Sequence, residues 1–245
     1  MQNDLTNEKI WSIGKSLSHS FSSSYFENKF STNNLLDCSY QNFELDNIDN
    51  IRSFVFDNKL QGLNVTIPYK EKIIKHLDSL SEEALQIGAV NCISINGDKI
   101  MGHNTDHYGF TKSLIPLIQE RHKKALILGT GGASKAIAYS LQKLEIEFEF
   151  VSRKGNVNYQ NLSPYLQNGF SIIINTTPLG THPKINTFPD LPYQLIDESF
   201  LLYDLVYNPK TTAFLQFGKE KKCIIKNGYE MLTFQAEKSW QIWNR

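Results

Sequence analysis

One stretch, residues 125–134 with the sequence ALILGTGGAS, constrains the fold more than any other part of the chain. Ala125–Leu128 is a short apolar run typical of a buried strand, and three glycines within the next four residues make a turn with almost no side chain. Ala133–Leu141 follows with the composition of a helix. A strand, a glycine turn and a helix in this order predict a dinucleotide site. The glycines let the backbone approach a pyrophosphate, and the helix N-terminus presents free N–H groups.

The glycine pattern departs from Gly-x-Gly-x-x-Gly at its third position, which is Ser134. On the loop alone, an ordinary tight turn between a strand and a helix stays an alternative. About 20 residues after a dinucleotide loop, a second strand should end beside the ribose. Glu147–Val151 supplies that strand, and Ser152, Arg153 and Lys154 follow it. An acidic residue there would bind a free 2′-hydroxyl, whereas two cations suit a 2′-phosphate, so the sequence favours NADP over NAD.

Composition excludes several classes of function. The chain carries 25 Lys and Arg against 25 Asp and Glu, so its charge gives no sign of binding to nucleic acid or to an anionic membrane. No apolar stretch approaches the ~18 residues of a membrane span, and the first residues lack the apolar core of a signal peptide. Cys38, Cys92 and Cys223 are far apart and form no Cys-x-x-Cys pair, which indicates a reducing compartment without disulfides or a zinc site. We therefore expect a cytoplasmic globular protein.

Ahead of the glycine loop, strand-like and helix-like segments alternate, as in a small α/β domain. We expect strands at Lys9–Gly14, Ser39–Leu45, Gly62–Ile67, Gly88–Ile95 and Lys99–Gly102, and helices that start at Tyr25 or cover Ile48–Phe56, Tyr69–Leu77 and Tyr108–Glu120. Ser79 and Glu82 are expected to form a capping box for another helix, and Pro116 is expected to kink the helix it lies in.

Beyond the loop, the alternation continues and predicts a doubly wound parallel sheet. The expected strands are Ser171–Asn175, Phe200–Leu205 and Lys222–Lys226, and the expected helices are Thr211–Lys219 and Met231–Trp243.

The segment Asn64–Lys70, with the sequence NVTIPYK, carries a candidate substrate site. Asn64 and Thr66 lie two apart on the expected strand, so their side chains share a face and can bind substrate hydroxyls. Lys70 falls in the first turn of the expected helix, where the helix dipole disfavours a cation. A lysine placed there in a cleft can act in proton transfer, although most lysines are simply exposed.

Other polar residues have simpler alternatives. The serine-rich loop before Tyr25 can hold an anionic carboxylate, but a polar loop with a helix cap accounts for it equally well. Asp106 precedes a helix, as a capping residue would. His103 and His107 are four residues apart, yet no carboxylate accompanies them as in a metalloprotease, so we expect no metal site.

Eight short motifs, taken in order along nearly the whole chain, resemble those of the shikimate dehydrogenase family. They stand at His19–Ser22, Asn64–Lys70, Gly88–Asn91, Asn104–Asp106, Gly129–Ala133, Asn175–Gly180, Tyr203–Tyr207 and Gly228–Ala236. The resemblance implies NADPH-dependent, reversible reduction of 3-dehydroshikimate to shikimate, a step toward chorismate and the aromatic amino acids. It implies a small-molecule substrate and a monomer or homodimer.

The resemblance also implies roles for individual residues. Lys70 and Asp106 would be the catalytic pair, with Lys70 supplying a proton and Asp106 orienting it. Ser20, Ser22 and Tyr207 would bind the substrate carboxylate. The ring hydroxyls would be held by the polar set Asn64, Thr66, Asn91, Asp106 and Gln235. NADP(H) would contact the set Gly129, Thr130, Gly131, Gly132, Ala133, Ser134, Ser152, Arg153, Lys154, Thr176, Thr177, Leu205 and Gly228.

The family fold implies a substrate domain at residues 1–104, completed by a returning helix at 228–245, and an NADP-binding Rossmann domain at 105–227. The sequence also departs from the family in several places. Prolines are missing near Ser16 and Ser23, Lys154 replaces a frequent threonine, and Thr181 replaces a frequent methionine. The region 155–169 is short, so one helix flanking the sheet should be trimmed or lost.

Three alternatives remain open at this stage. A quinate/shikimate dehydrogenase would tolerate another ring hydroxyl and use NAD, against which the cations at 153 and 154 argue. A non-catalytic sensor of the same ligand should lack Lys70 or Asp106, and both are present. Another NADP enzyme with two domains, such as a folate dehydrogenase, would not need the serine pair or the Asn-Val-Thr segment.

Overall fold

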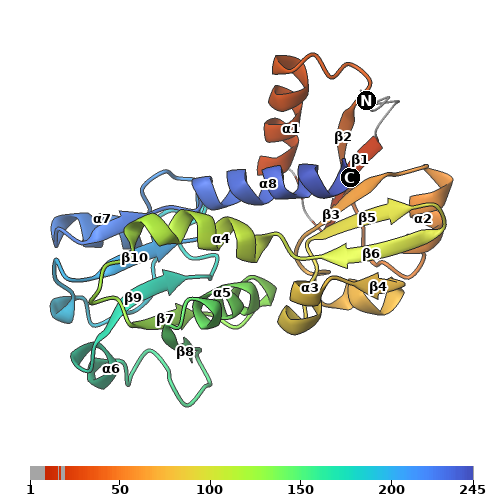
Figure 1. The fold of residues 1–245 in the computed structure, drawn as a ribbon. Coiled ribbons are helices and arrows are strands. Elements are labelled where there is room, and N and C mark those ends of the chain that lie inside the picture. The colour runs from red at the N-terminus through yellow and green to blue at the C-terminus, as the bar shows by residue number, and fades with distance from the viewer. Residues whose placement is uncertain (1–8, 16, 18–19, 245) are drawn as a thin grey trace. The chain divides into compact units, whose positions relative to one another are not determined.

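The computed structural model describes residues 9–15, 17 and 20–244, which form two compact units (Figure 1). Unit 1 comprises Met1–Thr105 and Gln235–Arg245, and unit 2 comprises Asp106–Phe234. Ser16 and His19 lie outside the described residues. No helix among the described residues is both long enough and apolar enough to cross a bilayer.

Unit 1 is built on a six-stranded mixed sheet with strand order β2-β1-β3-β5-β6-β4. Strands β2, β1 and β3 are parallel, whereas β5 runs antiparallel to both β3 and β6. In chain order its elements are β1 (Lys9–Gly14), α1 (Phe21–Thr32), β2 (Ser39–Glu44), α2 (Ile51–Asp57), β3 (Gly62–Val65), the 3₁₀ helix η1 (Lys72–His76), β4 (Ser79–Leu80), α3 (Glu82–Ile87), β5 (Cys92–Asn96) and β6 (Lys99–His103).

The two faces of this sheet are buried in different cores, because side chains alternate along each strand. Trp11 and Ile13 of β1 belong to a core with α2, α3 and η1. Ile10 belongs to the other core, which α1 and the C-terminal part of α8 (Tyr229–Trp243) cover with aromatic side chains. Alternation places Ser12 and Asn64 on that second face. It is the face on which the polar residues of the candidate site gather.

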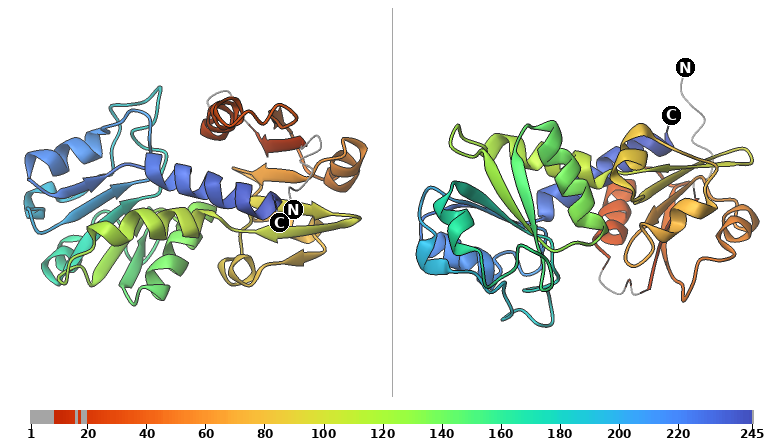
Figure 2. Two further views of the ribbon diagram at one scale, coloured as in Figure 1. Left: turned by 45° about the horizontal axis from the view of Figure 1, so that its top comes forward. Right: turned by 90° about the horizontal axis from the view of Figure 1, so that it is seen from below.

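Unit 2 contains a five-stranded sheet in the order β11-β10-β9-β7-β8, and every neighbouring pair is parallel (Figure 2). The expected doubly wound parallel sheet is therefore confirmed. In chain order its elements are α4 (Asp106–Leu114), the 3₁₀ helix η2 (Ile115–Leu117), β7 (Lys124–Leu128), α5 (Gly132–Lys143), β8 (Glu147–Val151), α6 (Ser163–Gln167), β9 (Phe170–Asn175), the 3₁₀ helix η3 (Tyr193–Leu195), β10 (Leu201–Asp204), α7 (Ala213–Glu220), β11 (Ile224–Lys226) and the first residues of α8.

Helices cover both faces of this sheet, and this explains why its central strands are apolar on both sides. Ala125 and Ile127 of β7 pack with α4, α5 and the start of α8, whereas Leu126 and Leu128 pack with α6 and α7. Helix α6 has five residues, so the helix expected to be trimmed or lost is trimmed.

Several expected element bounds are wrong. The strand expected through Ile67 ends at Val65, and the helix expected over Tyr69–Leu77 is only η1. Pro68 cannot donate a backbone hydrogen bond to a neighbouring strand, so the strand ends before it. The chain enters β4 at Ser79, and the residues between form a turn and η1 in place of a longer helix. Lys70 therefore lies in a turn and feels no α-helix dipole.

Other helix ends also differ from the expectation. Helix α4 does not kink at Pro116 but ends at Leu114 and continues as η2, because proline removes a helical hydrogen bond. Helix α3 is capped by Ser81, whose Oγ accepts from Ala84 N at 3.2 Å, rather than by Ser79.

Gly62 allows α8 to pack against β3, and this contact can be tested. A Cβ at Gly62 would lie 2.5 Å from the Trp243 ring, whose Nε1 donates to Ile93 O at 2.8 Å. Because a hydrogen-bonded indole cannot shift freely, Gly62→Ala should lower the free energy of unfolding by about 1–3 kcal/mol, measured by urea denaturation. In a Trp243→Leu background the same substitution should cost about 0.5 kcal/mol or less, since the clash is gone. An equal cost in both backgrounds would refute the clash.

Candidate active site

The glycine turn after β7 has the geometry that only glycine can provide at its first position. Gly129 has φ +115°, and a Cβ there would lie 2.7 Å from Thr176 Oγ1. The Thr176 hydroxyl itself donates to Leu128 O at 2.7 Å, so β7 and the segment after β9 are held close together. Any side chain at position 129 would separate them.

The start of α5 leaves room for a ligand. A Cβ at Gly131, the N-cap of α5, would meet no atom within 4 Å, so packing inside the protein does not explain this glycine. The first N–H groups of a helix have no intrahelical partner and attract anions. Ser134, at the third motif position, is buried, and its Oγ donates to Gly131 O at 2.6 Å. The serine thus supports the turn in place of a glycine.

The end of β8 presents two cations. Gly129 N donates to Val151 O at 2.9 Å, so β8 ends next to the glycine turn. Ser152 N donates to Val157 O at 3.1 Å and closes a short turn that carries Arg153 and Lys154, both exposed. The arrangement fits a nucleotide with a 2′-phosphate, because the two cations that would bind this phosphate lie next to the glycine turn that would hold the pyrophosphate.

A buried hydrogen-bond network lies at the ends of β9 and β10. Asp204 is fully buried, and its carboxylate accepts from Asn175 Nδ2 at 2.9 Å, Thr212 Oγ1 at 2.6 Å and Val206 N at 3.0 Å. Asn175 Oδ1 in turn accepts from Thr177 N and from its hydroxyl, at 3.1 and 2.6 Å. The network fixes both loops that leave the sheet here.

Sequence reasoning assigned no role to Asp204, Asn175 or Thr212. The signal that could have found the first two is a polar residue at the end of an otherwise apolar strand, which must be paired when buried. The expected cofactor residues Thr176 and Thr177 lie in the loop that this network holds.

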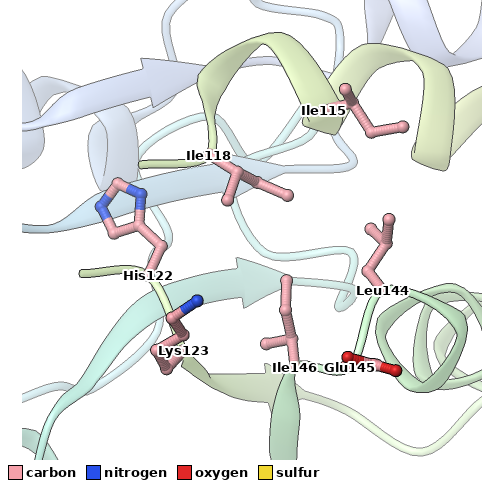
Figure 3. A pocket seen from close by; sticks show the side chains of 7 residues that line it. All are labelled: Ile115, Ile118, His122, Lys123, Leu144, Glu145 and Ile146. Atoms are coloured by element: carbon pink, nitrogen blue, oxygen red, sulfur yellow. The ribbon is translucent and has the colours of Figure 1, made fainter. Parts of the chain in front are cut away.

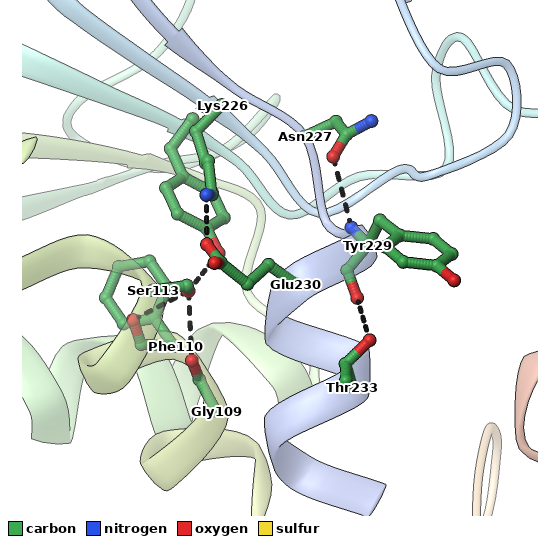
Figure 4. Close-up of polar contacts among 9 residues, drawn as sticks. Gly109, Phe110, Ser113, Lys226, Asn227, Tyr229, Glu230 and Thr233 are labelled. Atoms are coloured by element: carbon green, nitrogen blue, oxygen red, sulfur yellow. Dashed lines mark hydrogen bonds and ion pairs between the residues drawn. The ribbon is translucent and has the colours of Figure 1, made fainter. Parts of the chain in front are cut away.

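Leu205 and Gly228, also expected near the cofactor, contact each other. A Cβ at Gly228 would lie 2.1 Å from Leu205 O, so glycine is required for this close backbone approach, and Gly228 N donates to Val206 O at 3.1 Å. Figure 4 shows how α8 then begins, with Glu230 bound to Lys226, and with Thr233 Oγ1 donating to Tyr229 O at 3.1 Å.

Expected substrate residues of unit 1 lie around β3. Asn64 is the last but one residue of this strand, is buried, and donates from Nδ2 to Tyr40 Oη at 2.9 Å. Thr66 lies just past the strand, and its N donates to Ile13 O at 3.0 Å. Lys70 follows in the turn before η1, and its backbone carbonyl accepts from Val90 N at 2.7 Å. The lysine is thereby joined to the residue that precedes Asn91.

Asn91 and Gln235 belong to one network although 144 residues separate them. Asn91 Nδ2 donates to Gln235 Oε1 at 2.9 Å, and Asn91 Oδ1 accepts from Thr105 N at 2.6 Å. The Thr105 hydroxyl lies 3.1 Å from that of Ser239, which donates to Gln235 O at 2.9 Å. Since the Gln235 amide oxygen is already an acceptor within the protein, its Nε2 is the group left to serve as a donor to a ligand.

Ser20 and Ser22 lie at the start of α1. This helix begins at Phe21, earlier than the expected Tyr25, because Ser20 is its N-cap and accepts from Ser23 N at 3.4 Å. A capping hydroxyl oxygen keeps its own O–H as a donor, so the helix cap and an anion-binding role are compatible.

Asp106 and Tyr207 belong to unit 2. Asp106 is the buried first residue of α4, where a carboxylate interacts favourably with the helix dipole. Tyr207 follows β10, and burial raises the pKa of its phenol. The structure describes Asp106 and Lys70 in different units, so their pairing stays a prediction.

A pocket elsewhere in unit 2 is not part of this site. Ile115 and Ile118 face Leu144 and Ile146 across it (Figure 3), with His122, Lys123 and Glu145 around them. These residues precede β7 and β8 or follow α5, so the pocket is at the amino ends of the strands, opposite the glycine turn. Within residues 9–15, 17 and 20–244, no group of three or more His, Cys, Asp or Glu could hold a metal ion.

The parallel sheet, its glycine turn and the cations after β8 define the class: a two-unit α/β protein in which one unit is a Rossmann-type nucleotide-binding fold. Residues 12–93 match the family model described as shikimate dehydrogenase substrate binding domain. A relative from Caldicellulosiruptor saccharolyticus, named shikimate dehydrogenase (NADP(+)), is 35% identical over 96% of this chain and 92% of its own length.

Solved structures agree. Shikimate dehydrogenase 1 from Peptoclostridium difficile is 35% identical, with a TM-score of 0.86 over 97% of this chain and 92% of that one. Shikimate 5-dehydrogenase from Thermus thermophilus, solved with NADP(H) and shikimate, is 27% identical, with a TM-score of 0.81 over 96% and 93%. The chain belongs to the shikimate dehydrogenase family.

The network around Asp204 predicts a pH dependence of stability. Burial raises the pKa of Asp204 to about 6, although Thr212, Val206 and Asn175 donate hydrogen bonds to it and offset part of that effect. Because the folded state holds this proton to higher pH than the unfolded state does, the contribution to stability is present at low pH and is lost as pH rises through about 6. Between pH 4 and 7 the stability advantage of the wild type over Asp204→Asn should therefore shrink by about 2 kcal/mol.

Urea denaturation of both proteins at several pH values measures this difference. Thr233→Val, which removes an exposed hydroxyl from α8, is a control whose difference from the wild type should not vary with pH. If the stability of the wild type relative to Asp204→Asn grows with pH, the three hydrogen-bond donors outweigh burial, and the conclusion that the pKa of Asp204 is raised is wrong.

Proposed function

We propose that the protein is an NADP(H)-dependent shikimate dehydrogenase, which reversibly reduces 3-dehydroshikimate to shikimate. The observation that carries this proposal is the similarity to relatives of that name, which are 35% identical to this chain over nearly its whole length. The sequence contains both expected catalytic residues, Lys70 and Asp106. A place in chorismate and aromatic amino acid synthesis and a cytoplasmic location follow from the same proposal.

The residues of unit 2 fit the cofactor. The open space at Gly131 and the N–H groups at the start of α5 suit a pyrophosphate, and Arg153 and Lys154 suit a 2′-phosphate. Gly129, Gly132, Ala133 and Thr130 would line the turn. When bound, NADPH supplies the hydride that reduces the substrate ketone.

The residues of the protein then place the substrate and manage one proton. Hydride addition to a ketone leaves an alkoxide, and Lys70 would donate the proton that neutralises it. Asp106 would orient Lys70 and one ring hydroxyl. In the direction of shikimate oxidation, the same lysine would accept the proton.

The donor and acceptor inventory of unit 1 suits a polyhydroxylated ring with a carboxylate. Ser20 and Ser22 offer hydroxyl donors at a helix N-terminus, where an anion is favoured, and Tyr207 would assist them. Asn64, Thr66, Asn91 and Gln235 would bind ring hydroxyls. Asn91 and Gln235 are buried and already hydrogen-bonded to each other, so their side chains are held in place before the substrate arrives.

Most of the substrate residues lie in the substrate domain proposed for residues 1–104 with 228–245, and most of the cofactor residues lie in the cofactor domain proposed for 105–227. Asp106 and Tyr207 are substrate residues within 105–227, and Gly228 is a cofactor residue within 228–245. As a monomer or a homodimer, the protein would have one such pair of domains in each chain. Sedimentation equilibrium distinguishes the two states.

Removal of the Lys70 amino group tests the catalytic assignment. The wild type should oxidise shikimate with NADP in a spectrophotometric assay, in preference to quinate and to NAD. Lys70→Ala should lower kcat by about 10²–10⁴-fold, because general acid–base catalysis contributes that much, while KM for shikimate changes far less. Lys72→Ala, two residues further along in η1, is the matched control and should keep wild-type activity. Equal activity of Lys70→Ala and the wild type would refute the role.

Arg153 tests the choice of nucleotide. Reversing its charge should raise KM for NADP about tenfold or more and leave KM for NAD within about threefold, because only NADP carries the 2′-phosphate. Lys123→Asp makes the same charge change just before β7, at the amino end of the sheet, and should affect neither constant. Equal effects of Arg153→Asp on both nucleotides would remove the argument for phosphate binding.

A further inference from the structure

Tyr40 is a buried polar residue of unit 1 that the expected site does not include. It lies in β2, and its ring stacks on Phe26 of α1 with centroids 4.7 Å apart and planes 17° apart. The pair belongs to the core that α1 and α8 form over this face of the sheet. Because a tightly packed ring has no alternative orientation, the position of its hydroxyl is fixed.

Three polar side chains, those of Asn64, Ser12 and Ser22, surround the hydroxyl of Tyr40. Asn64 Nδ2 donates to it at 2.9 Å, and the side chains of Ser12 and Ser22 are close enough to lower its pKa. Ser12 and Asn64 are register partners on β1 and β3, whereas Ser22 lies in the first turn of α1. Two of these neighbours, Asn64 and Ser22, are residues proposed to bind substrate.

Asn64 has one polar atom that the protein does not satisfy. Its Oδ1 is buried and has no hydrogen-bond partner among the residues that the structure describes. A buried carbonyl oxygen without a hydrogen bond is unfavourable, so such an atom in a binding site indicates that a ligand supplies the donor. Because Tyr40 takes the NH₂ group of this amide, the group left for the ligand is an acceptor.

We propose that Tyr40 is a positioning residue for the substrate: it holds Asn64 so that Oδ1 accepts from a ring hydroxyl, and it holds Ser22 so that its O–H points to the carboxylate. The inference rests on the proposed function. The phenol oxygen accepts from Asn64. In the proposed arrangement it would also accept from Ser12, and the phenol proton would go to Ser22, whose own proton is then free for the carboxylate.

The protonation state of the phenol supports this arrangement. Burial raises the pKa of Tyr40 to about 12, and the side chains of Asn64, Ser12 and Ser22 beside the phenol partly oppose this effect. The phenol therefore keeps its proton throughout the pH range in which the enzyme can be assayed. A tyrosinate would reverse the donor direction toward Ser22, and burial prevents this.

Tyr40→Phe is the decisive variant, because it removes the hydroxyl and keeps the ring that packs on Phe26. It should raise KM for shikimate about 10–100-fold, as expected for a hydrogen bond that supports binding of a charged ligand, while kcat and KM for NADP stay within about threefold. Tyr193→Phe removes a phenol that donates to Pro189 O at 2.8 Å in unit 2, and is the matched control that should leave all three constants unchanged.

A double-mutant cycle shows whether Tyr40 acts through Asn64. In an Asn64→Ala background, Tyr40→Phe should raise KM for shikimate by a factor at least about threefold smaller than it does in the wild type, because the amide it orients is gone. Additive effects would overturn the positioning role. Ser12→Ala removes a hydroxyl beside the Tyr40 phenol without changing the packing of the ring, and it should raise KM for shikimate by about two- to fivefold. If Tyr40→Phe does not fold, this variant tests the positioning role of Tyr40 instead, and an unchanged KM would overturn that role.

The outcomes separate this inference from the proposed function. If the wild type oxidises shikimate with NADP and Tyr40→Phe has an unchanged KM, the assignment of Tyr40 is overturned and the enzyme assignment stands. If the wild type has no activity with shikimate and does not bind it by isothermal titration calorimetry, the proposed function fails and the role of Tyr40 fails with it.

Discussion

The hydrogen bonds between Asn91, Thr105 and Gln235 are the interaction on which the substrate side of the site depends. Asn91 lies just before β5, Thr105 ends the first segment of unit 1, and Gln235 lies in the returning helix α8. The hydrogen bonds join these three parts of the chain. All three side chains are buried, so each lost partner would leave a polar group without water or protein to satisfy it. This penalty gives the network its rigidity, and rigidity is what a site needs to hold a small polar ring in one orientation.

Buried hydrogen bonds also hold the loops of unit 2 that would contact the nucleotide. Asp204 and Asn175 are polar residues at the ends of apolar strands, and together with Thr212 they anchor the loops that carry Thr176, Thr177 and Leu205. The glycines act differently. Gly129 is required by its positive φ and by the Thr176 side chain beside it, and Gly228 by the backbone of Leu205. Gly131 has free space beside it, which packing inside unit 2 does not explain.

The donor and acceptor roles within the site follow from its internal partners. Gln235 uses its amide oxygen inside the protein and Asn64 uses its amide nitrogen, so the two amides present opposite groups to a ligand. A ring with several hydroxyls, each able to donate and accept, fits such a mixed set. The chemistry of the ligand can thus be inferred from hydrogen bonds that do not involve it.

Local patterns in the sequence determined the order of the elements, the parallel sheet of unit 2 and the glycine turn, because apolar periodicity and glycine act over a few residues. The tertiary structure decided the rest. Whether Lys70 begins a helix depended on where the chain enters β4, and not on the proline before it. Tyr40 and Asn64 are 24 residues apart, and Asn91 and Gln235 are 144 apart. Such pairs leave no local signal, since only the folded chain brings their polar atoms together and buries them.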